Sequence, residues 1–346
     1  MTLSYNRYET IQVAGRGAFG IVVVARDNVS KKRVAIKRIL VPNVSKLQLV
    51  REISSLRCLH HRNILKYLDC FGTADMISIV TEEVPYTFGD VIKDKSRPKT
   101  EELNRWYYSQ ILSGIAYIHS KDIMHRDIKP ENILVTLRNI IKIADFGQAC
   151  FYMKDHPDEE YDENVATRWY RAPELLFGSR KYGPSVDIWA IGCILAELIR
   201  GKPIFPGRSE LEQISVIFGV LGTPNETNWP KWRTMPDANK LLFEPKEPRN
   251  NWSEILRSKE VSQEFDNFLR LHLQLCCDFR PAASVLLMHS WVKKGDSLAE
   301  PVYRISKRNA EKNRRDALPP LHICSEVTGT QCQKFTEMIN HAFFIK

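Results

Sequence analysis

The sequence of 346 residues lacks the apolar run of ~18–20 residues that a membrane-spanning helix needs, and its first residues lack a signal-peptide pattern. Its eight cysteines are scattered and form no CxxC pair, which argues against a zinc site or a disulfide framework. We therefore expect reduced thiols, a cytosolic or nuclear protein and no membrane span. The net charge of +9 comes without the aromatic pattern of a base-stacking surface, so no specific nucleic acid is expected as a partner.

The order of the local patterns predicts an α+β fold with two lobes. Strand-like runs dominate the first 84 residues and surround one helical pattern at 45–59. This region, 1–84, is expected to form a small β-rich lobe with one regulatory helix. Strongly apolar helical patterns follow, which predicts a larger, mainly helical lobe over 85–292. From 293 to 346 the chain is basic and aperiodic, so we expect a partly irregular tail.

A glycine-rich segment lies between two strand-like runs near the N-terminus. It begins at Gly15 and reads GRGAFGIV, ending at Val22. Taken alone, such a pattern is as consistent with a tight hairpin as with a ligand site. Its place between two strands argues against a dinucleotide fingerprint, which needs a strand followed by a helix. A hairpin that covers phosphates needs glycine because backbone amides must approach closely.

Lys37 ends the strand-like run VAIK, where its neighbours are core-forming residues. An ammonium without a partner is costly in such a place, so it needs anionic groups such as phosphates and a carboxylate. Glu52, on the predicted helix, is the candidate carboxylate. A buried ion pair of this kind is costly unless both members are engaged, so it can also serve as a conformational switch.

The octapeptide HRDIKPEN, which begins at His125, is the most specific signal in the chain, and the tripeptide DFG follows at Asp145. Asp127 would accept the proton of a substrate hydroxyl, and Lys129 would neutralise charge on a transferred phosphoryl group. Asn132 and Asp145 offer the hard oxygen ligands that Mg²⁺ prefers. A buried polar turn would not also explain the lysine, the glutamate and the glycines upstream.

In this order and spacing, the motifs resemble those of a eukaryotic protein kinase over roughly residues 8–292. The ending WYRAPE and the segment 202–230 resemble the cyclin-dependent and mitogen-activated (CMGC) group, and most closely its cell-cycle-related, cilia-associated members. The resemblance implies a bilobal protein kinase fold with ATP and Mg²⁺ as cofactors. It further implies transfer of the ATP γ-phosphate to protein Ser or Thr followed by Pro, and a possible place at the cilium.

The resemblance also implies which residues bind the nucleotide. Thr81 takes the gatekeeper position, and the backbones of Glu82 and Val84 bond adenine. The full implied set is Ala14, Gly15, Arg16, Gly17, Ala18, Phe19, Gly20, Ile21, Val22, Ala35, Lys37, Thr81, Glu82, Val84 and Leu134.

The segment after DFG is expected to face the protein substrate. Thr167 is expected to bond to Asp127 and Lys129 in the motif at 125–132, which we call the catalytic loop, and is counted with the catalytic residues. Arg171 stands where the CMGC group holds an arginine that shapes the pocket for the residue after the phosphoacceptor. Glu174 is expected to form a structural ion pair with Arg280, and Asp187 to receive backbone amides of the catalytic loop.

Two departures from the resemblance concern regulation near the nucleotide. Ala18 and Phe19 replace a Thr-Tyr pair that inhibitory kinases modify, and neither has a hydroxyl. Lys37 and Glu52 are 15 positions apart, which is closer than is usual for cyclin-dependent kinases, and the usual cyclin-facing motif is missing. We therefore do not expect a standard cyclin, and a non-standard cyclin-like activator is the remaining partner of this kind.

Two further departures lie in the stretch from DFG to APE, residues 145–174, which the resemblance identifies as the activation segment. Asp162 stands where the group has its activating phosphothreonine, and Cys150 stands where it has one of three phosphate-binding arginines. The other two positions hold Arg51 and Arg126. We hypothesise that Asp162 permanently mimics the phosphate by pairing with Arg126, with Arg51 as a second candidate. The alternative is that Asp162 is one more solvated acid in the run DHPDEEYDEN.

Three functions stay open at this point: an active Ser/Thr kinase, a pseudokinase scaffold gated by nucleotide binding, and a nucleic-acid-binding module driven by the basic tail at 293–346. Lys37, Asp127 and Asp145 are all present, which favours the active enzyme. Gln148 replaces the usual Leu after DFG, and the sequence does not decide whether it loosens the segment or bonds locally. Neither the physiological substrate nor phosphorylation of Tyr161 can be read from the sequence.

Overall fold

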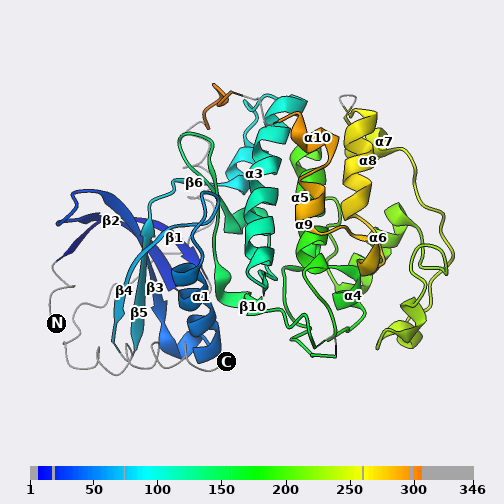
Figure 1. The fold of residues 1–346 in the computed structure, drawn as a ribbon, viewed down its shortest axis with the longest axis horizontal. Coiled ribbons are helices and arrows are strands. Elements are labelled where there is room, and N and C mark those ends of the chain that lie inside the picture. Colours follow the sequence, from blue (N-terminus) through cyan, green and yellow to red (C-terminus); the bar gives the residue numbers. More distant parts are fainter. Residues whose placement is uncertain are drawn as a thin grey trace.

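The computed structural model describes residues 7–17, 20–73, 75–156, 158–258, 261–295 and 299–305. Figure 1 shows a small lobe built on a β-sheet beside a larger, mainly helical lobe. The predicted α+β, bilobal fold is confirmed. None of the helices in the described ranges is long and apolar enough to cross a membrane.

The small lobe is a five-stranded antiparallel sheet in the order β1-β2-β3-β5-β4. A Cβ on Gly20 would lie 1.9 Å from the carbonyl oxygen of Arg38, so this start of the second strand tolerates only glycine. Lys37 pairs with Val22 on one side and Ile79 on the other, which fixes its place in the sheet. The strands are β1 (Tyr8–Gly17), β2 (Gly20–Asp27), β3 (Arg33–Leu40), β4 (Tyr67–Gly72) and β5 (Met76–Glu82).

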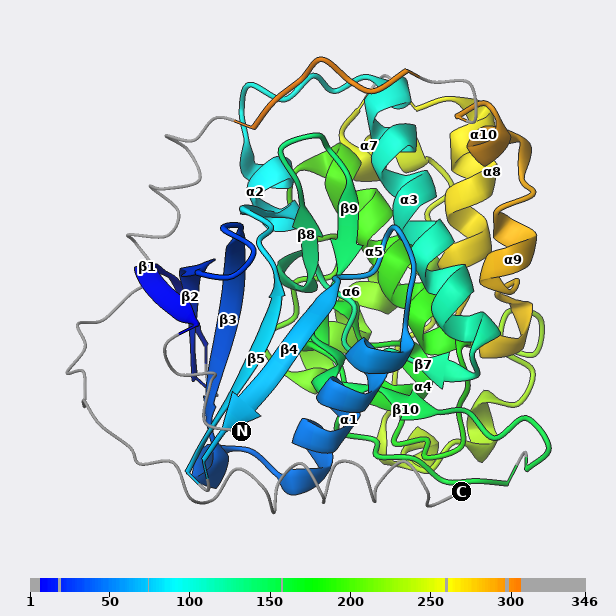
Figure 2. The same cartoon turned by 60° about the vertical axis from the view of Figure 1, so that its left-hand side comes forward.

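Helix α1 (Lys46–Cys58) packs against the sheet, as Figure 2 shows, and confirms the helix predicted at 45–59. A capping box starts it: the Ser45 hydroxyl accepts from the Gln48 amide at 3.1 Å, and the Gln48 side chain accepts from the Ser45 amide at 3.3 Å. Its buried positions are Leu49, Glu52, Ile53 and Leu56. Glu52 therefore lies on the apolar face of the helix, directed into the protein.

The helical lobe is organised around α3 (Glu101–Ser120) and α5 (Ser185–Arg200), and nearly every residue of α5 is buried. Two small sheets lie next to these helices. They are β6 (Tyr86–Thr87), β8 (Ile133–Val135) and β9 (Ile141–Ile143), and the pair β7 (Ile123–Met124) and β10 (Cys150–Phe151). The remaining helices are α2 (Phe88–Lys93), α4 (Pro173–Leu176), α6 (Glu210–Leu221), α7 (Trp252–Leu256), α8 (Gln263–His272), α9 (Ala283–Leu286) and α10 (Ser290–Lys293).

The β8–β9 hairpin places the two candidate metal ligands. Asn132 directly precedes β8, and Asp145 comes two residues after the end of β9. Because the strands are antiparallel neighbours, the start of one and the end of the other lie at the same edge of the sheet. The hydrogen bond from the Ala144 amide to the Asn132 carbonyl, at 2.9 Å, joins them there.

His272, the last residue of α8, is fully buried. Its Nδ1 lies 2.9 Å from the carbonyl oxygen of Phe268, which can only accept, so Nδ1 carries the proton. Its Nε2 then accepts from the Tyr108 hydroxyl of α3 at 2.7 Å. Burial lowers the pKa of His272 to about 4, so the neutral ring joins α3 to α8.

We expect the free energy of unfolding to fall as the pH drops from about 6.5 toward about 4, because the unfolded chain protonates His272 first. The two pKa values correspond to a loss of at most about 3 kcal/mol. Urea denaturation at about pH 7 and about pH 4.5 measures it. His272→Gln keeps donor and acceptor but cannot titrate, so its loss should be smaller. Equal losses in the two proteins would contradict this account.

Candidate active site

A cleft of about 740 Å³ is lined by the small-lobe sheet together with α2 and the β8–β9 hairpin. The predicted nucleotide residues that line it are Ala14, Gly15, Val22, Ala35, Lys37, Thr81, Glu82, Val84 and Leu134. Gly20 and Ile21 belong to β2 but are not among its lining residues, and Arg16 and Gly17 end β1. Ala18 and Phe19 lie outside the described residues.

The cleft has further lining residues that the sequence did not point to. Glu131 and Ala144 stand beside Asn132 and Asp145, so adjacency in the chain was a signal for them. No sequence pattern marked the residues from α2. The additional set is Gln12, Val24, Arg33, Leu56, Leu65, Ile79, Glu83, Pro85, Tyr86, Thr87, Gly89, Asp90, Lys93, Glu131 and Ala144.

The ammonium of Lys37 contacts two carboxylates at the inner end of the cleft. Its Nζ lies 2.7 Å from Oε1 of Glu52 and 3.2 Å from Oδ1 of Asp145. Burial opposes the charge of Lys37, but the two carboxylates outweigh it and raise the pKa of Lys37. Burial likewise opposes the charge of Asp145, and Lys37 holds the pKa of Asp145 below its ordinary value. The predicted pair of Lys37 and Glu52 is thus formed, with Asp145 as a third member.

The donor set fits a cation that is shared with a second anionic molecule. Within the described residues, no group of three or more His, Cys, Asp or Glu could hold a metal ion by itself. Asp145 keeps 43% of its side chain exposed, and Asn132 uses Nδ2 for its bonds to Asp127. One carboxylate and one amide oxygen suit Mg²⁺ when phosphate oxygens complete the coordination.

The catalytic loop brings three predicted residues into contact. Asp127 Oδ2 lies 2.7 Å from the ammonium of Lys129. Asp127 Oδ1 accepts from the amide and the hydroxyl of Thr167 at 3.1 and 3.0 Å. Lys129 also donates to the Thr167 hydroxyl at 3.0 Å. The arrangement holds a carboxylate and an ammonium side by side, which suits transfer of a proton and of a charged group.

Asp187, near the start of α5, binds the backbone of this loop. One carboxylate oxygen accepts from the amide of His125 and the other from the amide of Arg126, each at 2.9 Å. His119 Nε2 lies 2.9 Å from the same carboxylate. The contacts agree with the expectation that Asp187 receives backbone amides, and they hold the loop to the core of the helical lobe.

Glu174 and Arg280 form a bidentate ion pair that is buried on both sides. The two nitrogen–oxygen distances are 2.7 and 2.8 Å, and the two side chains are 2% and 0% exposed. Arg280 also donates to the carbonyl oxygens of three further residues, so its charge is well satisfied. The pair anchors the end of the activation segment as expected.

Arg171 spans the turn just before that anchor. Its Nε donates to the carbonyl of Val165 at 3.0 Å and its Nη2 to the carbonyl of Ala166 at 3.1 Å. Its third nitrogen pairs with Glu210 at 2.6 Å. Ala166 has φ of +65°, a strained backbone for a residue with a Cβ. Arg171 therefore engages two carbonyl groups beside the catalytic loop.

The contacts of Asp162 differ from the hypothesis that it pairs with Arg126. The Asp162 carboxylate lies 3.6 Å from Arg51 and is 61% exposed. Arg126 is buried and donates to the Gln148 carbonyl at 2.7 Å and to the Tyr182 hydroxyl at 2.9 Å. Tyr182 in turn donates to the backbone carbonyl of Asp162 at 2.5 Å. The Tyr182 hydroxyl thus connects Arg126 to the backbone of Asp162, while the Asp162 carboxylate pairs with Arg51.

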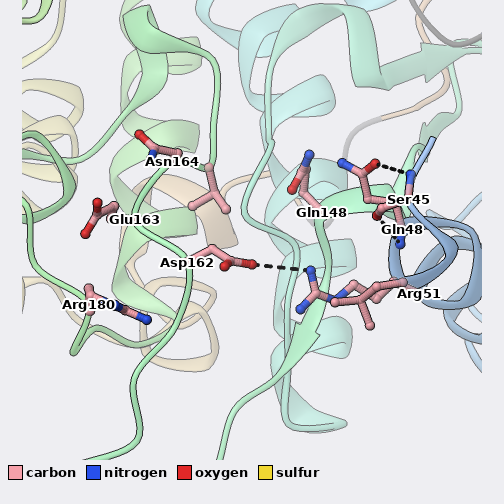
Figure 3. Close-up of a pocket in the computed structure, with 10 residues that line it drawn as sticks. Ser45, Gln48, Arg51, Gln148, Asp162, Glu163, Asn164 and Arg180 are labelled. Carbon is pink, nitrogen blue, oxygen red and sulfur yellow. Dashed lines mark hydrogen bonds and ion pairs between the residues drawn. The ribbon is translucent and has the colours of Figure 1, made fainter. Parts of the chain in front are cut away.

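A polar pocket of about 390 Å³ separates α1 from the activation segment, and Figure 3 shows the residues around it. The side chain of Gln148 lines this pocket. Its other lining residues are Ser45, Leu47, Gln48, Arg51, Asp162, Glu163, Asn164, Val165 and Arg180. Cys150 lies close to this region, and burial raises the pKa of its thiol to about 11, so it adds no charge.

Comparison with known proteins agrees with this geometry. The family described as "Protein kinase domain" matches residues 8–292. Cyclin-dependent kinase 20 of Danio rerio is 39% identical over 251 residues, which are 70% of this chain and 72% of the relative. Cyclin-dependent kinase 7 of Xenopus laevis is 41% identical over 237 residues, which are 67% of each chain.

Protein kinase domains use ATP and Mg²⁺ in general. The cleft fits both, because Asn132 and Asp145 offer oxygen ligands to the metal and Lys37 offers a positive charge to phosphate. The resemblance to protein kinases of the cyclin-dependent group, made from the motifs alone, is confirmed, while its cilia-associated refinement stays a prediction. The chain belongs to the protein kinase family and, within it, to the cyclin-dependent-kinase-like (CMGC) branch.

Proposed function

We propose that this chain is an active serine/threonine kinase that transfers the γ-phosphate of ATP to protein hydroxyls. The observation that carries the proposal is the double contact of Lys37 with Glu52 and Asp145. A scaffold that only binds nucleotide has no need for this arrangement beside an equally assembled catalytic loop. The Lys37 contacts and the assembled catalytic loop together support catalysis by this chain.

The residues divide the work of phosphoryl transfer. Lys37 binds phosphate oxygens at the inner end of the cleft. Asp145 and Asn132 would hold Mg²⁺, which supplies positive charge to the phosphates when it is bound. Asp127 accepts the proton of the substrate hydroxyl and orients its oxygen. Lys129 stabilises the negative charge that develops on the transferred group.

Selection of proline after the phosphoacceptor follows from the contacts of Arg171. The carbonyl groups of Val165 and Ala166 accept from Arg171, so they are engaged at the site that faces the next substrate residue. An ordinary residue there would leave its backbone N–H without a partner, at a cost of about 1–3 kcal/mol. Proline has no N–H and escapes this cost.

The activation segment is proposed to need no phosphate at position 162. Tyr182 bridges Arg126 to the Asp162 backbone, and Arg51 pairs with the Asp162 side chain. The bridge is buried and the ion pair is exposed, so the bridge contributes more to the order of the segment. A role in cilium or cell-cycle signalling, a cytosolic, nuclear or ciliary location and a non-standard cyclin-like activator are proposed from the sequence resemblance alone.

Replacing Asp127 with Asn should lower phosphate transfer to a generic basic protein by at least about a hundredfold, because the general base is lost. Asp127 does not line the cleft, so affinity for a nucleotide analogue should stay within about threefold. Radiolabelled phosphate transfer and calorimetry measure the two effects. A wild-type chain that binds nucleotide but transfers nothing would favour the scaffold alternative.

Wild-type kcat/KM should be about ten- to a hundredfold higher for a Ser-Pro peptide than for its Ser-Ala counterpart, given the cost of an unpaired N–H. Arg171→Ala frees both carbonyl groups and should reduce this ratio to below about threefold. Glu210→Gln is the matched control, because it alters the remaining contact of Arg171 but not the carbonyl contacts. A preference for proline that survives in Arg171→Ala would refute this explanation.

The purified chain alone, without partner or upstream kinase, should phosphorylate a Ser-Pro peptide. Tyr182→Phe removes a buried bridge and should lower this activity by about tenfold, since it leaves charged and backbone groups unpaired. Asp162→Ala removes only an exposed ion pair and should cost less than about fivefold. Silence of the wild type would instead point to an activator, and a larger effect of Asp162→Ala would restore the mimicry hypothesis.

A further inference from the structure

Residues 300–305, which come after α10 in the chain, pack against the helical lobe; we call them the strap. Ile305 is buried in the main hydrophobic core, and Tyr303 packs against that core. Val302, which lies between Pro301 and Tyr303, is 93% exposed. The strap contains neither helix nor strand, so its order depends on these side-chain contacts and on the hydrogen bonds below.

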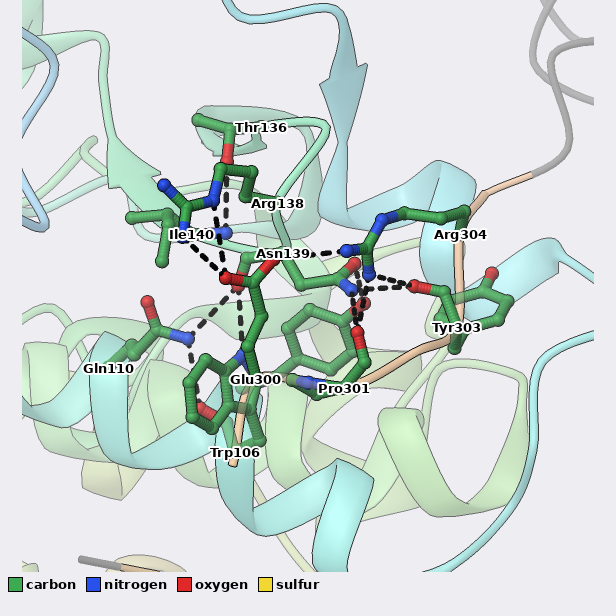
Figure 4. A network of polar contacts seen from close by, with 11 residues as sticks. Trp106, Gln110, Thr136, Arg138, Asn139, Ile140, Glu300, Pro301, Tyr303 and Arg304 are labelled. Carbon is green, nitrogen blue, oxygen red and sulfur yellow. Dashed lines mark hydrogen bonds and ion pairs between the residues drawn. The ribbon is translucent and has the colours of Figure 1, made fainter. Parts of the chain in front are cut away.

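The first anchor of the strap is Asn139, in the β8–β9 turn. Its Nδ2 donates to the carbonyl of Tyr303 at 2.7 Å and lies 3.5 Å from that of Pro301, as Figure 4 shows. Its Oδ1 accepts from the buried Tyr107 hydroxyl of α3 at 2.7 Å, and its carbonyl accepts from Trp106 at 3.0 Å. Asn139 thus has all its polar groups engaged and joins the strap, the hairpin and α3.

The φ of Asn139, +58°, supports this reading of the turn. Asparagine is one of the few residues that adopt the left-handed region at low cost. Asparagine meets two requirements at this position. It adopts the backbone conformation of the turn, and its side-chain amide donates to the strap while it accepts from Tyr107.

The second anchor joins the strap to α2. The Tyr303 hydroxyl donates to Oδ2 of Asp94 at 2.7 Å, and Asp94 is 4% exposed and directly follows the last residue of α2. The other carboxylate oxygen of Asp94 accepts from the amide and hydroxyl of Ser96 at 2.9 and 2.7 Å. Burial and Asp94 raise the pKa of Tyr303, so its hydroxyl stays a donor at ordinary pH.

A third contact is weaker. Glu300 pairs with Arg138 at 2.8 Å and with Arg304 at 3.0 Å. Arg138 is 78% exposed, so this ion pair is screened by solvent and contributes little to binding of the strap. The buried anchors at Asn139 and Asp94 therefore determine where the strap lies.

Both buried anchors stand on elements that form the nucleotide cleft. Gly89, Asp90 and Lys93 of α2 line the cleft, and Asp94 is the next residue in the chain. Leu134 of β8 lines it as well, and Asn139 closes the hairpin to which β8 belongs. The strap ties the end of α2 to this hairpin from outside the cleft.

We propose that Tyr303 is a positioning residue for nucleotide binding: through Asp94 it holds α2 against the β8–β9 hairpin and so sets the shape of the cleft. Release of the strap loosens α2 and lowers the affinity for nucleotide, while the catalytic loop, which the strap does not touch, keeps its geometry. The strap is thereby coupled to the cleft. The proposal deepens the proposed kinase function, and its binding arm is independent of catalysis.

The test uses Tyr303→Phe in the full-length chain, which removes the hydroxyl and keeps the ring. Calorimetry with a non-hydrolysable ATP analogue should show affinity about three- to tenfold weaker than in wild type. The KM for ATP should rise by a similar factor with kcat within about twofold, and hydrogen exchange should quicken at residues 91–97. A general loss of stability would instead lower kcat and the fraction of active protein. A raised KM with nearly unchanged kcat therefore distinguishes a positioning role from such a loss.

Two matched variants control for the strap itself. Val302→Ala changes an exposed neighbour, and Glu300→Gln removes the exposed ion pair; both should bind the analogue as wild type does. Asp94→Asn leaves one acceptor oxygen where Asp94 uses two, so its affinity for the analogue should fall at least as far as that of Tyr303→Phe.

Unchanged affinity and unchanged exchange at residues 91–97 in Tyr303→Phe would overturn the proposal, as would equal effects of Tyr303→Phe and Val302→Ala. A wild type that binds the analogue but transfers no phosphate would instead sink the proposed function, and leave the binding and exchange results as a valid test of the strap.

Discussion

The contact of Lys37 with Glu52 and Asp145 is the interaction on which the active site depends, because it is made by three separate elements. Lys37 comes from β3, Glu52 from α1, and Asp145 from the end of the β8–β9 hairpin in the other lobe. Taking such charges out of water costs several kcal/mol per ion, and only close opposite charges offset this. The site therefore exists only when sheet, helix and hairpin are all in place, which makes the position of α1 a requirement for activity.

Buried polar anchors give the helical lobe a comparable rigidity. Asp187 holds the catalytic loop through two backbone amides, and Glu174 holds the activation segment through Arg280. Neither carboxylate faces the cleft, yet each would leave buried groups without partners if it were lost, at a cost of a few kcal/mol. The catalytic loop and the end of the activation segment are thus held to the helical lobe by buried contacts.

Much of this could be predicted from the sequence because the information is local. The helix that carries Glu52, the strand-like run that ends at Lys37 and the polar set at Asp127 follow from periodicity and from short motifs. The partner of Arg126 could not be predicted, since Tyr182 lies 56 positions along the chain and no pattern links the two. The packing of the strap could not be predicted either, because it depends on two buried hydrogen bonds and follows no periodic pattern. Contacts of this kind depend on the assembled fold and not on neighbouring residues.

In the activation segment, the groups that Arg126 contacts are neutral. A phosphate would bring about two negative charges and three acceptor oxygens to the arginines around it. Here Arg126 donates to a carbonyl and a hydroxyl, and the hydroxyl passes the contact on to the backbone of Asp162. Hydrogen bonds from a charged donor contribute about 1.5–3 kcal/mol, whereas the exposed pair of Arg51 and Asp162 is worth at most about 1 kcal/mol. The order that we propose for the segment therefore rests on Tyr182 more than on the Asp162 carboxylate.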